Sequence, residues 1–138
     1  MKVSRHLARP RRQRGFTLIE LMIVISIILI LISTAIPMYQ QSLRRARESV
    51  LKQNLFTLRS VIDQYSEDKQ KAPQSLQDLL DAGYLKQIPT DPITNSRDTW
   101  QTVQEDVLVS VDQSQPGISD VHSGAQGTAS DGTNYSEW

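Results

Sequence analysis

The sequence has no cysteine and only two histidines in 138 residues. Without cysteine the chain can form neither a disulfide framework nor a thiolate metal site. His6 lies in a basic leader, and His122 stands beside Ser123, but a histidine and a serine adjacent in sequence do not form a nucleophilic dyad. The sequence also lacks a phosphate loop, an H-E-x-x-H pattern and a dinucleotide fingerprint. We therefore expect no enzyme activity.

Acidic residues are absent from the start of the chain, and basic residues are few in its second half. Residues 1–15 carry six Lys or Arg and no acid, whereas residues 60–138 carry four Lys or Arg against 13 acids. The formal net charge of zero hides this asymmetry. The positive-inside tendency predicts that the basic start is cytoplasmic and that the acidic end lies across a membrane. Nothing in the balance indicates a nucleic-acid partner.

A long apolar run follows the basic start. From Phe16 to Ile36 there are 21 residues, of which only Glu20 is charged. As a helix rising about 1.5 Å per residue, the run would measure about 30 Å, the thickness of a bilayer core. A carboxylate in such a helix is costly, so we expect Glu20 to be compensated. Pro37 follows the run and should bend or loosen the helix, because it removes one intrahelical hydrogen bond.

The junction between leader and apolar run carries a specific pattern. Gly15 ends the leader, and Phe16-Thr17-Leu18-Ile19-Glu20 begins the run. A basic leader ending in glycine, then this pentapeptide and an unbroken apolar helix, resembles the class III signal of type IV pilins and of the pseudopilins of type II secretion. The resemblance implies cleavage by a prepilin peptidase between Gly15 and Phe16, N-methylation of Phe16, and subunit assembly through Glu20 and Pro37. In that family the glutamate faces the N-terminal amine of a neighbouring subunit, and the proline marks a region where the helix melts and stretches inside a filament.

Two other interpretations of the N-terminus stay open. In an ordinary secretory signal, Ser33-Thr34-Ala35 would be the cleavage site, although the length of the run and its glutamate make it a poor signal core. In a plain single-pass anchor, the glycine, aromatic and glutamate spacing would be a coincidence.

Beyond Pro37 a single apolar stripe predicts an amphipathic helix over residues 38–72, and the whole helix is expected from about Thr17 to Glu67. The stripe consists of Leu43, Ala46, Val50, Leu51, Leu55, Leu58, Ile62 and Tyr65. On another side Arg45, Lys52 and Arg59 recur every seven residues and form a basic ridge. The ridge is either a solvated face or a contact for the acidic heads of neighbouring subunits.

Residues 73–138 predict a small head. Pro73 suits the first position of a short helix that ends at Ala82, with Gly83 after it. The strands are expected at Trp100–Val103, Glu105–Val111 and Ile118–His122. Tyr135 and Trp138 indicate that the end of the sequence docks on the head. The segment Gly83-Tyr84-Leu85 with Ile88-Pro89-Thr90-Asp91-Pro92 is similar to the one that leads into the sheet of G-type major pseudopilins.

The C-terminal part also offers oxygen ligands for a hard cation. They are the side chains of Asp120, Ser123, Ser130 and Asp131 and the carbonyl groups around Gly124 to Gly127. Ca²⁺ takes six to eight oxygens in flexible geometry. The resemblance implies calcium as a cofactor, because G-type pseudopilins bind it in a similar C-terminal loop. The alternative is a glycine turn in which Asp131 is an ordinary turn residue.

The sequence as a whole predicts an α+β, pilin-like fold in which a long N-terminal helix, first transmembrane and then amphipathic, packs on a small antiparallel sheet. The expected parts are a cleaved basic leader (1–15), a transmembrane and polymerisation helix (16–37), an amphipathic helix (38–72) and a head with a C-terminal loop (73–138).

The resemblance implies a structural subunit that polymerises with copies of itself into a periplasmic pseudopilus of type II secretion. It would be anchored by one pass in the inner membrane, with its head in the periplasm. The implied partners are a prepilin peptidase, an inner-membrane assembly platform, an assembly ATPase and minor pseudopilins. Two alternatives are a type IV pilin of a surface pilus and a membrane-anchored binding module that does not polymerise.

Overall fold

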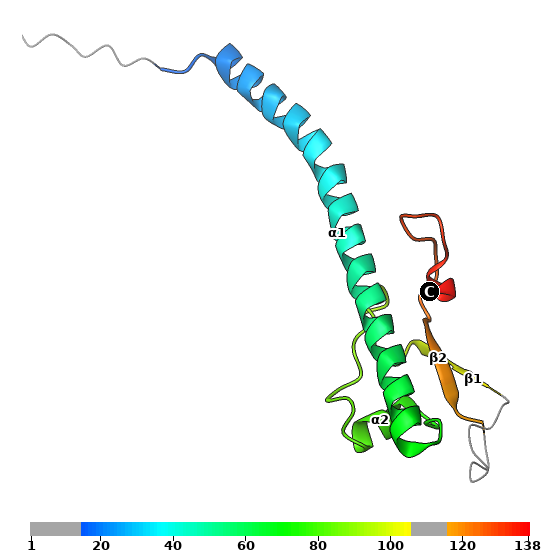
Figure 1. Cartoon of the computed structure of the whole chain (residues 1–138). Helices are drawn as coiled ribbons and strands as arrows, with labels where there is room; N and C mark the ends of the chain where they lie inside the picture. The colour runs from blue at the N-terminus through cyan, green and yellow to red at the C-terminus, as the bar shows by residue number, and fades with distance from the viewer. Residues whose placement is uncertain (1–14, 106–115) are drawn as a thin grey trace, which may run out of the picture. The chain divides into compact units, whose positions relative to one another are not determined.

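The computed structural model describes residues 15–105 and 116–138. The chain forms two compact units, Met1–Tyr39 and Gln40–Trp138, and helix α1 runs through both. The elements that follow α1 all belong to the second unit (Figure 1). From here on, the head means this whole unit, Gln40–Trp138, which includes the second part of α1. The strand predicted at Glu105–Val111 falls outside the described residues except for Glu105, which lies beyond the end of strand β1.

Helix α1, Leu18–Lys69, is 52 residues long, so the predicted long helix is confirmed. It continues through Pro37 without a break. It ends three residues before the expected limit of 72, because Gln70 adopts a left-handed backbone conformation with φ of 55°. A residue in that conformation is a common way for a helix to end.

The head contains an antiparallel pair of strands, β1 (Trp100–Gln104) and β2 (Ile118–Ser123). Trp100 lies opposite Ser123, and Val103 lies opposite Asp120. The register shifts between Val103 and Gln104, where the strand pairing is irregular. The first and third predicted strands are thus confirmed, and with them the small antiparallel sheet.

The core of the head forms where one face of α1 meets the sheet and the segments around it. Its buried side chains are Leu51, Leu55, Leu58, Ile62 and Tyr65 from α1, with Leu79, Trp100, Ile118, Val121, Ala125, Ala129 and Tyr135 from the rest of the head. The predicted stripe is wrong in its first part, because Leu43, Ala46 and Val50 are exposed. Val50 precedes Leu51 by one residue and therefore points about 100° away around the helix.

The short helix α2, Leu76–Asp81, begins later than predicted. Its N-cap is Ser75, whose hydroxyl accepts the N–H of Asp78, while the Asp78 carboxylate accepts the N–H of Ser75. This reciprocal capping sets the start of the helix. Pro73 is therefore not its first residue; its carbonyl instead accepts the N–H of Ile118 at 2.7 Å and so joins the segment before α2 to β2. Gly83, with φ of 81°, follows the C-cap as predicted.

The C-terminal loop, residues 124–134, leads into a single 3-10 turn, η1 (Tyr135–Glu137). Tyr135 is buried, and Trp138 packs against the core with its ring edge-on to Tyr135, at 5.4 Å between ring centroids. The predicted docking of these two aromatic residues is confirmed.

Candidate functional site

The first turn of α1 places Glu20 beside the predicted cleavage point. Thr17 caps the helix: its hydroxyl oxygen accepts the N–H of Glu20 at 3.3 Å, and its carbonyl accepts the N–H of Leu21 at 3.2 Å. Glu20 thus lies in the positive end of the helix dipole, which favours a carboxylate. The Glu20 side chain has no hydrogen bond or ion pair within the part of the chain that the structure describes.

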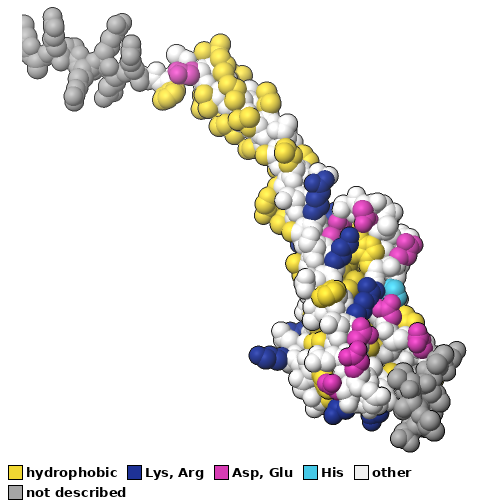
Figure 2. All heavy atoms as spheres, in the orientation of Figure 1, with side chains coloured by type: hydrophobic (Ala, Val, Ile, Leu, Met, Phe, Trp, Pro, Cys, Tyr) yellow, Lys and Arg dark blue, Asp and Glu magenta, His cyan; other side chains and the backbone are white. Residues whose placement is uncertain are grey.

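The first half of α1 is long and apolar enough to cross a membrane. Its most apolar 18-residue window has a mean hydropathy of 2.8, and none of that window is buried. Apolar side chains dominate the surface of this half of the helix (Figure 2). Just before Pro37, the hydroxyls of Ser33 and Thr34 donate to the carbonyls of Ile30 and Leu31. They therefore do not satisfy the Ser33 carbonyl, which lacks the N–H that Pro37 cannot supply.

Gly15 has open space around it. A β-carbon built on Gly15 would meet no atom within 4 Å. The described residues around Gly15 therefore leave room for a side chain at this position.

The four predicted calcium ligands do not converge in the structure. The Asp120 carboxylate accepts a bond from Arg59 Nε at 2.6 Å, and the Ser123 hydroxyl donates to the Asp91 carboxylate at 2.5 Å. Ser130 turns toward α1, where its N–H and hydroxyl both donate to Glu48.

Asp131, the fourth predicted ligand, accepts the N–H and hydroxyl of Thr133, and its other oxygen lies 3.5 Å from Lys52 Nζ. The hydrogen bonds from Thr133 and the charge of Lys52 hold the pKa of Asp131 below its ordinary value. Within residues 15–105 and 116–138, no three His, Asp or Glu side chains group together as metal ligands. Calcium binding stays a prediction, and the residues as placed do not form a ligand sphere.

Two members of the basic ridge are paired within the chain. Lys52 contacts Asp131 and lies 4.1 Å above the Trp138 ring. Arg59 binds Asp120 and also donates to the Val121 carbonyl at 2.9 Å. These contacts join α1 to β2 and to the C-terminal residues, whereas Arg45 is exposed. The ridge is therefore neither a purely solvated face nor free as a whole to bind a neighbouring subunit.

Sequence reasoning missed two buried carboxylates. Asp91 accepts bonds from the N–H groups of Ile93 and Thr94 and from the Ser123 hydroxyl, and so ties the turn after α2 to the end of β2. Glu48 accepts hydrogen bonds from the N–H of Ser130 in the C-terminal loop and from the hydroxyl of Tyr135. A weak signal for Glu48 exists, because it lies three residues before Leu51 and hence on the buried face of α1.

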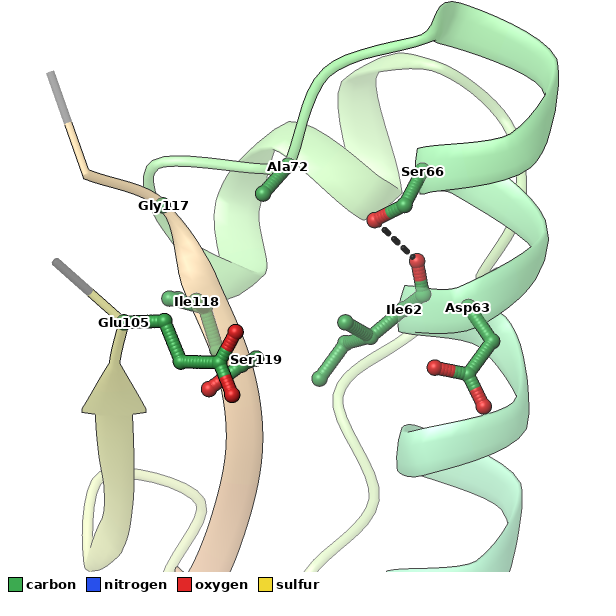
Figure 3. Close-up of a pocket in the computed structure, with 8 residues that line it drawn as sticks. All are labelled: Ile62, Asp63, Ser66, Ala72, Glu105, Gly117, Ile118 and Ser119. Carbon is green, nitrogen blue, oxygen red and sulfur yellow. Dashed lines mark hydrogen bonds between the residues drawn. The ribbon is translucent and has the colours of Figure 1, made fainter. Parts of the chain in front are cut away.

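A cavity of about 280 Å³ lies between the end of α1 and the start of β2 (Figure 3). Asp63 and Glu105 are its carboxylates, and the Ser66 hydroxyl, which also lines it, donates to the Ile62 carbonyl at 2.8 Å. Both carboxylates are exposed, so we assign no ligand to this cavity.

The profile of the prokaryotic N-terminal methylation motif matches residues 10–36. This motif opens an apolar helix whose continuation packs on a small antiparallel sheet. Motif and fold together define a pilin-like protein.

Two curated proteins that resemble this chain are both named type II secretion system core protein G. The protein from Aeromonas hydrophila is 31% identical over 103 residues, covering 63% of this chain and 72% of the relative. That from Escherichia coli strain K12 is 32% identical over 100 residues, covering 61% and 69%. A shorter likeness, 48% over 52 residues, covers 38% of this chain and 36% of prepilin peptidase-dependent protein D of the same strain. No solved structure matches significantly. The chain belongs to the family of type II secretion system core protein G, and is a pseudopilin subunit of type II secretion.

Proposed function

We propose that the mature chain, which begins at Phe16 after cleavage behind Gly15 and N-methylation, polymerises with copies of itself into a periplasmic pseudopilus. The observation that carries this proposal is the first half of α1, an apolar helix exposed on every side whose only charge is Glu20. A helix that is apolar all round needs lipid or other apolar helices as neighbours. The membrane supplies the first environment, and a filament of packed helices supplies the second.

The charge pattern supports a single pass through the inner membrane. The six basic residues of the leader favour the cytoplasmic side, which leaves the head, residues 40–138, in the periplasm. Assembly in this orientation calls for a prepilin peptidase, an inner-membrane assembly platform, an assembly ATPase and minor pseudopilins, and these are the partners that we propose.

Glu20 is the residue that would set the stagger between subunits. Cleavage leaves a cationic amine on Phe16, four residues before the Glu20 carboxylate. Either charge alone is costly in lipid, whereas a pair costs less. Because no described group binds the Glu20 carboxylate, it is free to meet the amine of a neighbouring subunit. The Glu20 carboxylate and the Phe16 amine neutralise each other only when the incoming subunit has the correct axial position, so this pairing stabilises that position alone.

The test compares Glu20→Ala and Glu20→Asp with the wild-type chain in cells that carry the secretion machinery. Glu20→Ala should be inserted and cleaved but should form no filaments and secrete nothing, whereas Glu20→Asp should be partly active because its charge remains with a shorter reach. Immunoblots report processing, electron microscopy reports filaments after overexpression, and enzyme release reports secretion. Asp98→Ala, which removes an exposed carboxylate from the head, is the matched control and should assemble normally.

Filaments of normal length and number from Glu20→Ala would refute the assembly role of Glu20. A wild-type chain that is processed but never polymerises would favour the membrane-anchored binding module. Filaments that leave the cell at native expression would favour a surface pilus.

A further inference from the structure

The C-terminal loop is held to α1 by the buried carboxylate of Glu48, which is 5% exposed. Its Oε1 atom accepts the N–H of Ser130 at 2.8 Å and the hydroxyl of Tyr135 at 2.9 Å. Its Oε2 atom accepts the Ser130 hydroxyl. A buried carboxylate is costly unless both of its oxygens are satisfied, and hydrogen bonds to an ionised acceptor are among the strong ones. Ser130 and Tyr135 therefore supply the hydrogen-bond donors that the buried Glu48 carboxylate needs. Glu48 in turn fixes the position of the loop.

Arg44 lies one turn before Glu48 and completes the arrangement. Its Nε atom is 3.3 Å from Glu48 Oε1 and donates to the Tyr135 hydroxyl oxygen at 3.4 Å. Its Nη2 atom donates to the carbonyl of Thr128. We call the five residues Arg44, Glu48, Thr128, Ser130 and Tyr135 the Glu48 clamp. One cation and one anion from α1 thus bind the loop through both its backbone and its side chains.

The clamp and the neighbouring ion pairs engage three of the four side chains predicted as calcium ligands, Ser130, Asp131 and Asp120. The N–H and the hydroxyl of Ser130 both donate to Glu48, and Lys52 Nζ stands 3.5 Å from Asp131 Oδ2. Arg59 likewise forms an ion pair with Asp120, with its Nε atom 2.6 Å from Asp120 Oδ1. A calcium ion seeks six to eight free oxygens, and cationic side chains beside two of the carboxylates repel a further cation.

We propose that Glu48 fastens the C-terminal loop in this chain and that the loop docks without a metal ion. Side chains of α1 bind the loop groups that a calcium ion would otherwise bind. The inference concerns the head alone, so it holds whether or not the chain forms filaments.

The clamp makes loop docking sensitive to acid. Burial alone would raise the pKa of Glu48, but hydrogen bonds from Ser130 and Tyr135 and the charge of Arg44 outweigh it, so the pKa lies below the ordinary 4.5. A carboxylate with a lowered pKa stabilises the folded state above its unfolded pKa. That contribution is lost as the pH falls through the folded pKa, which places the release of the loop below pH 4.5.

Two more charges lie near the clamp. Lys52, one turn after Glu48 on α1, is paired with Asp131 of the loop. The pKa of Asp131 lies below its ordinary 3.8, so this pair also weakens in acid. A pH measurement must therefore compare the wild-type chain with a variant that lacks only the Glu48 carboxylate.

The experiment uses the full chain in detergent micelles. Amide hydrogen exchange is followed at Ser130, whose N–H binds Glu48, and across β2 as a measure of the rest of the head. Glu48→Gln keeps the size of the side chain but removes its charge, and Glu67→Gln is the matched control, an exposed glutamate on the same helix. Each protein is measured with calcium and with EGTA. Fluorescence of Trp138, in a Trp100→Phe background where it is the only tryptophan, follows docking against pH.

Glu48→Gln should speed exchange at Ser130 by about ten- to a hundredfold, the factor that corresponds to losing a hydrogen bond to a charged group, while β2 stays protected. Glu67→Gln should match the wild type, and EGTA should change none of the proteins. The Trp138 signal of the wild type should change below pH 4.5, and the change should be smaller in Glu48→Gln, where the contribution of Glu48 is absent and that of the Lys52–Asp131 pair remains. Faster exchange at Ser130 in EGTA, or normal exchange in Glu48→Gln, would overturn the proposal.

Discussion

Replacing Leu58 with alanine tests which face of α1 holds the head together. Leu58 is 0% exposed, whereas Phe56, two residues earlier, is 68% exposed. Removing a fully buried leucine side chain costs about 2.7–5 kcal/mol of the free energy of unfolding, because apolar transfer and packing are both lost. Phe56→Ala removes more atoms from an exposed site and should change that free energy by no more than about 0.5 kcal/mol. The pair thus separates burial from side-chain size.

Thermal unfolding of the fragment Gln40–Trp138 is the assay, because the fragment contains every residue of the buried core. In a domain of this size each kcal/mol shifts Tm by about 4–8 °C, so a loss of about 3 kcal/mol lowers Tm by about 12–24 °C. Circular dichroism at the helix band follows the transition. Equal melting temperatures for Leu58→Ala and Phe56→Ala, or a lower one for Phe56→Ala, would refute the assignment of the core face.

Gly15→Val should leave an unprocessed, unassembled precursor, because the fold tolerates a side chain there while a peptidase site at the membrane surface should not. N-terminal sequencing of the wild-type protein that began at Ile36 in place of N-methylated Phe16 would contradict this and favour a secretory signal. Gly124→Ala should destabilise the head by about 1–3 kcal/mol, the cost of overpacking, because its β-carbon would lie 2.1 Å from the Thr99 carbonyl oxygen. An unchanged melting temperature for Gly124→Ala would show that this close approach is not fixed.

The long helix could be predicted because its signals are local. The apolar run, the change of pattern after Pro37 and the spacing of Leu51, Leu55 and Leu58 each lie within a few turns of one another. The signals for the start of α2 are also local, but two of them compete. The fixed φ of Pro73 suits a first helical position, whereas the reciprocal bonds of Ser75 and Asp78 satisfy two orphan donors and decide the outcome.

The bonds of the C-terminal loop could not be predicted, since their partners are far apart in sequence. Ser130 and Tyr135 meet Glu48 across 82 and 87 residues, and Ser123 meets Asp91 across 32. Composition showed that the loop is rich in oxygen atoms, which suits a metal ion as well as hydrogen bonds to a buried carboxylate. Only the position of Glu48 on the buried face of α1 hinted at the second possibility.

The long sequence separation within the Glu48 clamp has a consequence for biosynthesis. Helix α1 leaves the ribosome well before Ser130 and Tyr135 exist, so its buried-face carboxylate must wait for the final stretch of the chain. A truncated product that stops before Ser130 keeps Arg44 beside Glu48 but lacks the three hydrogen bonds from Ser130 and Tyr135, and each bond to an ionised carboxylate is worth about 1.5–3 kcal/mol. That is a large share of the 5–15 kcal/mol by which a typical domain is stable. Docking of the C-terminal loop on α1 therefore follows the synthesis of Ser130 and Tyr135, long after α1 itself has been made.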